Sequence, residues 1–126
     1  MAVTHAAGVR DALAEVTRAA HAEGTTGEAV LQLRDDSAVV VEFEIGNTPF
    51  GAASSGVITL AGTPFDVTAD DDGILDNFVT RDRDGAQVLA GSVTATGMGG
   101  DIEVTNTNVA NLQDCSLDSL TYEAAP

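Results

Sequence analysis

The side chains that could act as a nucleophile or a general base are few and stand far apart in the sequence. The two histidines, His5 and His21, both fall within an amino-terminal segment of helical periodicity. Their separation places them roughly 160° apart around a helix that turns by about 100° per residue. Cys115 has no neighbouring basic residue that would lower its pKa and favour the thiolate. The sequence therefore predicts two exposed helix histidines, a small buried thiol and no catalytic residue.

Carboxylates are numerous enough to suggest glycoside hydrolysis, a reaction that uses a pair of Asp or Glu side chains. The chain contains 20 such residues. Sugar-binding sites also use aromatic rings as stacking surfaces, and the sequence has no Trp, one Tyr and four Phe. The composition therefore disfavours a glycosidase, and we expect a protein that is not an enzyme.

The segment that contains Asp70, Asp72 and Asp76 concentrates the hard oxygen ligands that calcium prefers. Asp70 and Asp72 fit the third and fifth positions of the helix-loop-helix calcium loop. Thr68 then falls at the first position and Val79 at the twelfth, so the first and last ligands are missing. We expect an acidic, solvated loop here, with a looser calcium turn as the alternative, and no cofactor.

Net charge is the strongest compositional signal. Twenty acidic residues face five arginines and no lysine, which gives a formal net charge of −15. Nucleic-acid binding depends on basic side chains that neutralise phosphates, so the composition excludes DNA and RNA as partners. No apolar run approaches the roughly 18 residues needed to cross a bilayer, and we expect no membrane partner. A single cysteine fits folding in a reducing cytosol.

An amphipathic helix is predicted from Thr4 to about Ala22. Val9, Leu13 and Val16 recur at helical spacing, and charged residues occupy the remaining surface. Thr4 is of the residue type that caps helix amino termini. The apolar stripe is narrow, so this helix needs a partner surface, either its own sheet or a neighbouring subunit.

The remainder of the chain has the periodicity of strands. After Gly27, strand-length pieces follow one another about every ten residues, and Ala38–Ile45 is the clearest because apolar and acidic residues alternate along it. We predict a mainly β fold, an antiparallel β-sandwich or barrel of about seven or eight strands with one N-terminal amphipathic helix. Residues 1–26 then form a helical arm and residues 27–126 the β-sandwich domain.

A hairpin is predicted around the Asp-Gly pair at 84–85, because this dipeptide favours a two-residue turn. A two-residue turn places Arg81 opposite Val88 and Phe78 opposite Gly91. The Phe78 ring would then cover backbone that has no side chain of its own.

Three segments resemble a group of small structural proteins of tailed bacteriophages, in which an amphipathic helix precedes Gly- and Thr-rich strands. The three segments of this chain are Thr48–Val57 (TPFGAASSGV), Phe78–Val93 (FVTRDRDGAQVLAGSV) and Asp101–Pro126, which contains IEVTNTNV and ends in SLTYEAAP. The chain departs from these proteins after the predicted strand Glu28–Leu33, where the short Arg34–Ser37 turn replaces a Gly/Pro-rich connection.

The resemblance implies a non-enzymatic virion protein, made in the host cytoplasm, that decorates or cements the capsid surface by bridging subunits of the major capsid protein. A second copy of the chain is a further expected partner. The expected partner-binding side chains are Val9, Leu13, Val16, Pro49 and Phe50, for which packing in the core is the other available role. A tail or fibre component of the virion and a calcium-dependent adhesion or binding module remain the alternatives.

Overall fold

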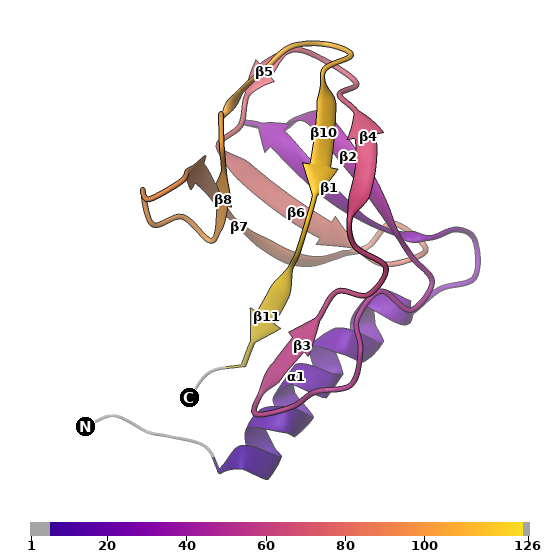
Figure 1. Cartoon of the computed structure of the whole chain (residues 1–126). Coiled ribbons are helices and arrows are strands. Elements are labelled where there is room, and N and C mark those ends of the chain that lie inside the picture. Colours follow the sequence, from indigo (N-terminus) through magenta and orange to yellow (C-terminus); the bar gives the residue numbers. More distant parts are fainter. Residues whose placement is uncertain (1–5, 125–126) are drawn as a thin grey trace.

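One helix and eleven strands make up residues 6–124, the part of the chain that the structure describes (Figure 1). The structure, a computed structural model, is mainly β with the helix at its amino-terminal end, as predicted. In chain order the elements are α1 (Ala7–Ala22), β1 (Ala29–Asp35), β2 (Ala38–Gly46), β3 (Val57–Thr59), β4 (Phe65–Thr68), β5 (Gly73–Ile74), β6 (Asn77–Arg81), β7 (Gln87–Ala95), β8 (Ile102–Val104), β9 (Asn108–Val109), β10 (Asp114–Leu117) and β11 (Thr121–Glu123). The strands outnumber the prediction because several contain only two or three residues, too few for an alternating pattern to reveal.

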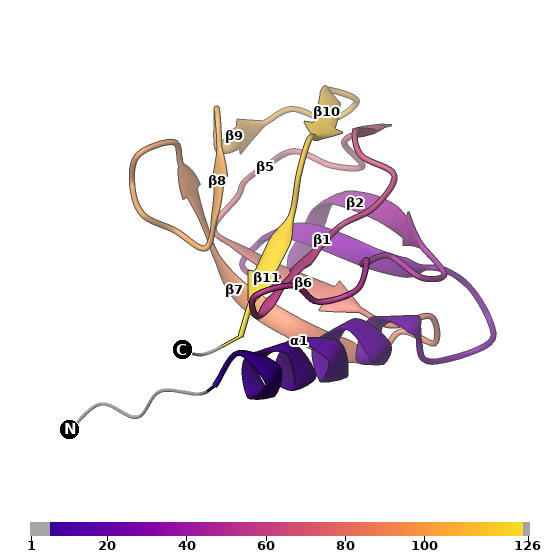
Figure 2. The same cartoon turned by 60° about the horizontal axis from the view of Figure 1, so that its bottom comes forward.

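A five-stranded sheet in the order β2-β1-β6-β7-β8 forms the main layer of the body. Its neighbouring strands are antiparallel, except that β8 runs parallel to β7. Three two-stranded ladders, β10-β4, β11-β3 and β5-β9, complete the body. Figure 1 shows β4 and β10 in front of the main sheet, and Figure 2 shows α1 along the lower side. The N–H of Asp70 donates to the carbonyl of Val40 at 2.8 Å, which connects the segment after β4 to β2 and continues the curl of the sheet.

Alternation along β1 and β2 builds the core. Leu31 lies opposite Phe43 and Leu33 opposite Val41, and all four side chains are buried. Burial of each such side chain contributes about 1.5–3 kcal/mol relative to its exposure. The predicted strand Ala38–Ile45 is confirmed as most of β2, in which Val41, Phe43 and Ile45 are buried and Val39, opposite Arg34 beyond a register shift, is only half-buried.

The predicted hairpin is present between β6 and β7, but its turn is longer than expected. The N–H of Asp82 donates to the carbonyl of Ala86 at 2.8 Å, which closes a loop of three residues instead of two. The Asp82 carboxylate also accepts a hydrogen bond from the N–H of Ala86 at 2.9 Å. Arg81 therefore lies opposite Gln87 and not opposite the predicted Val88.

A register shift next to the turn restores the predicted pairing further along, so that Phe78 lies opposite Gly91 as expected. A Cβ atom added to Gly91 would lie 2.6 Å from Cε1 of Phe78 and 2.7 Å from Oδ2 of Asp101. We expect Gly91→Ala to lower the free energy of unfolding by about 1–3 kcal/mol through overpacking, measured by urea denaturation. Gly8→Ala is the control because its added methyl group meets no atom within 4 Å, and an equal loss in both variants would contradict this account.

Helix α1 begins at Ala7, after Ala6 in an extended conformation that provides no side-chain cap. The predicted cap, Thr4, lies outside the described residues. After the helix, Gly24 has a φ of +107°, a backbone conformation that glycine adopts readily. Among residues 6–124 there is no helix with the length and apolar character needed to span a membrane.

Candidate functional site

The body of the protein covers one row of residues on α1, and the predicted apolar stripe lies on the uncovered side of the helix. The covered row consists of Arg10, Ala14, Thr17 and His21. Ala14 and His21 are 0% exposed, whereas Val9, Leu13 and Val16 are 47%, 41% and 69% exposed. The covered row follows the stripe by one sequence position, which corresponds to a rotation of about 100° around the helix. The stripe therefore does not pack on the chain's own sheet.

Polar contacts hold much of α1 against the body. They are Asp11 Oδ1 with the N–H of Gly56 at 2.6 Å, Glu15 Oε1 with the N–H of Ala53 at 2.7 Å, and Arg10 Nη2 with Glu123 Oε1 at 2.8 Å. The N–H of Ala53, and after it the hydrogen bond from Arg18, lowers the pKa of the Glu15 carboxyl. These carboxylates satisfy backbone donors in the β2–β3 loop. The sequence analysis expected charged residues on the uncovered surface of the helix. Three of them, Arg10, Asp11 and Glu15, instead attach the helix to the body.

The prediction that His21 is exposed to solvent is wrong, because its imidazole is fully buried between α1 and the sheet. Nδ1 lies 2.7 Å from the Thr17 carbonyl and Nε2 lies 2.8 Å from Oγ1 of Thr80. Burial lowers the pKa of His21 and so favours the neutral ring. The Thr17 carbonyl can only accept, so Nδ1 carries the proton of the neutral ring and Nε2 accepts from the Thr80 hydroxyl, whose oxygen also accepts a hydrogen bond from the N–H of Leu89 at 3.1 Å.

Pro49 and Phe50, which the sequence proposes as partner anchors, lie in the core. Phe50 is 3% exposed, and its ring centroid lies 4.8 Å from that of His21. Its backbone forms an isolated antiparallel bridge with Leu60. The prediction of an external anchor is wrong for these two side chains, because the fold already covers them with its own residues.

Asp70, Asp72 and Asp76 are not gathered around a common centre. Asp72 Oδ1 accepts a hydrogen bond from the N–H of Asn111 at 2.5 Å, and Asp76 Oδ1 accepts one from the N–H of Asp36 at 3.1 Å. Over residues 6–124, no group of three or more His, Cys, Asp or Glu side chains is placed to hold a metal ion. The carboxylates of Asp72 and Asp76 serve instead to bind backbone N–H groups of neighbouring loops.

Cys115 is partly buried, and its Sγ lies 3.5 Å from the carbonyl of Gln113. Burial, with a smaller effect from Asp114, raises the pKa of this thiol and so disfavours the reactive thiolate. The other residue considered for catalysis, His5, lies outside the described residues.

The exposed stripe of Val9, Leu13 and Val16 is therefore the surface on which we base a functional hypothesis. Aligned apolar side chains on a surface helix are a common feature of protein-binding sites. Helical periodicity identified these residues, but their direction depends on contacts with remote loops that the sequence does not reveal. Comparisons with protein-family models, with curated proteins and with solved structures found no match to this chain.

Proposed function

We propose that this chain is a non-enzymatic structural protein of a tailed-phage virion, and specifically a capsid decoration or cement protein. It is made in the host cytoplasm and attaches to the capsid surface, where it bridges subunits of the major capsid protein. The observation that carries the proposal is the apolar stripe of Val9, Leu13 and Val16, which the described residues, 6–124, leave 41–69% exposed. The likeness of its strand segments to small phage structural proteins supplies the virion context.

The size of the stripe favours a partner that presents many identical sites. Burial of the exposed parts of its three side chains would contribute about 2–5 kcal/mol. A contact of that strength alone corresponds to a dissociation constant in the millimolar range or weaker. Stable attachment therefore requires additional contact area or several linked contacts, and a capsid lattice provides repeated sites for both.

The net charge of −15 is compatible with such a role. Like charge on every copy keeps free molecules apart before they attach, and it keeps them away from the packaged DNA. Binding to assembled subunits, and not to separate ones, stabilises the assembled state by mass action.

The proposal is tested on purified particles of the phage that encodes this chain. We expect quantitative mass spectrometry to find copies in a fixed ratio approaching that of the major capsid protein. Particles that lack the chain should regain it when the recombinant protein is added, and they should bind Val16→Glu at least about tenfold more weakly because the substitution would bury an unpaired carboxylate.

Met98→Glu is the matched control, because Met98 is 74% exposed in the loop between β7 and β8 and the substitution adds the same charge. It should bind particles as the unmodified protein does. Only a few copies per particle would reject a head protein in favour of a tail or fibre component. Equal binding of Val16→Glu and the unmodified protein would exclude the helix stripe as the attachment site.

A further inference from the structure

The body of the protein has an open seam between β8 and β10. β8 is the last strand of the main sheet, and β10 pairs with β4 on its other side. Within residues 6–124, no ladder joins β8 to β10. The segment between them includes β9, which pairs with β5, and residues of both β8 and β10 line one cavity. Within the described residues, the main sheet is thus open at the outer edge of β8.

Both edges of the seam present backbone groups that have no strand partner within residues 6–124. The N–H of Ala69 donates to the carbonyl of Gln113. Since hydrogen bonding alternates along an antiparallel ladder, the N–H and carbonyl of Ser116 point away from β4 and toward the seam. On the other edge, the N–H of Thr96 donates to the carbonyl of Val104, which directs the backbone groups of Glu103 away from β7.

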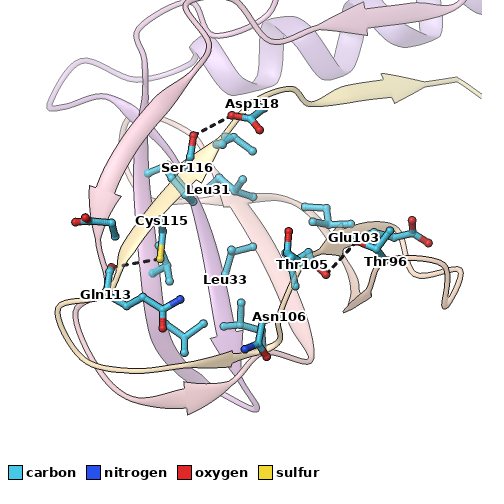
Figure 3. Close-up of a pocket in the computed structure, with 18 of the residues that line it drawn as sticks. Leu31, Leu33, Thr96, Glu103, Thr105, Asn106, Gln113, Cys115, Ser116 and Asp118 are labelled. Carbon is cyan, nitrogen blue, oxygen red and sulfur yellow. Dashed lines mark hydrogen bonds between the residues drawn. The ribbon is translucent and has the colours of Figure 1, made fainter.

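A cavity of about 540 Å³ lies in the seam, and core residues form its base. Figure 3 shows Leu31 and Leu33 between Cys115 on one side and Thr105 on the other. The volume lies in the range of sites that hold small ligands or short peptide segments. Leu31 and Leu33 at the base of the cavity are 0% and 7% exposed, so the apolar surface open to an inserted strand is that of the half-buried Ile102, Val104 and Cys115 along the two walls.

The rim of the cavity is acidic. Glu103, Asp114 and Asp118 line it, and it has no Lys, Arg or His among its lining residues. This charge favours a basic occupant and disfavours a second copy of this chain, which has a net charge of −15.

We propose that the seam binds an extended segment of a partner protein, with alternating apolar and basic residues, by addition of a β-strand between β8 and β10. Apolar residues of the segment contact Ile102, Val104 and Cys115 along the walls, and basic residues lie near the acidic rim. The backbone of the segment bonds to both open edges. The seam is separate from the stripe on α1, so this inference does not depend on the proposed capsid role.

The test uses the full chain labelled with ¹⁵N and a short blocked peptide of alternating Val and Lys. We expect the peptide to shift the amide resonances of Glu103, Thr105 and Ser116 most strongly. Ser116→Pro removes a donor on the seam side and leaves the β4 ladder intact, and it should weaken binding by about tenfold or more. Ser116→Ala keeps the N–H and should bind within about twofold of the unmodified protein.

A second peptide is N-methylated at its central Val residues and therefore lacks backbone donors of its own at these positions. It should bind weakly to the unmodified protein, and it keeps the test decisive if Ser116→Pro does not fold. The proposal is overturned if the N-methylated peptide binds as well as the first, or if the shifts spread evenly over the acidic surface. Either result would mean that charge alone attracts the peptide.

Discussion

Replacement of His21 by alanine is expected to lower the free energy of unfolding by about 3 kcal/mol, as measured by urea denaturation. The substitution removes a fully buried ring that contacts Phe50. It also removes the acceptor of the Thr80 hydroxyl, which then remains buried without one of its hydrogen bonds. A variant as stable as the unmodified protein would show that the contact of this ring with the sheet contributes little.

The same burial makes stability depend on pH. Since burial lowers the pKa of His21 below its ordinary value, the unfolded chain binds a proton more readily than the folded one as pH falls through that value. The contribution of His21 to the free energy of unfolding is therefore fully present above the ordinary pKa of histidine, and it is lost as pH falls toward the lowered pKa. The hydrogen bond to Thr17 and the charge of Asp82 oppose the lowering but do not reverse it.

A glutamine at position 21 separates this effect from the titration of the carboxylates. Glutamine can donate and accept hydrogen bonds but does not titrate. Between about pH 7.5 and 5.5, the unmodified protein should lose more stability than His21→Gln, although both contain the same acidic residues. Parallel stability curves for the two proteins would rule out His21 as the source of the difference.

Local patterns in the sequence predicted the parts of the fold that depend on near neighbours. The strand Ala38–Ile45 followed from alternation, and the position of Phe78 opposite Gly91 followed from a turn signal a few residues away. The prediction for Arg81 failed because the carboxylate of Asp82 joins a three-residue turn, a choice that the Asp-Gly pair does not determine.

The candidate site was predictable only in part, because the direction in which a helix face points and the pairing of a strand edge depend on residues distant in the sequence. The spacing of Val9, Leu13 and Val16 identified an apolar stripe, but the hydrogen bond between His21 and Thr80, 59 residues apart, helps to set which row of α1 is covered. The open seam was hidden for a similar reason. A short strand such as β8 has the same local pattern whether or not its outer edge has a partner.

Phe50 and Val16 were both expected to contact a partner, and the structure predicts opposite results for them. Phe50→Ala should lower the free energy of unfolding by about 3–5 kcal/mol, because it empties a buried site beside His21. Val16→Ala should change that free energy by about 0.5 kcal/mol or less, because Val16 is 69% exposed. Urea denaturation of the two variants, side by side with the unmodified protein, measures both values.

The contrast between these two variants decides which apolar residues are available to a partner. A large loss of stability in Phe50→Ala assigns this ring to the core, and binding defects in that variant would then reflect unfolding. Near-normal stability in Val16→Ala leaves the helix stripe free for binding studies on a folded protein. If Val16→Ala were instead as destabilised as Phe50→Ala, the stripe would be packed against the chain itself, and the principal observation for a docking surface on α1 would be lost.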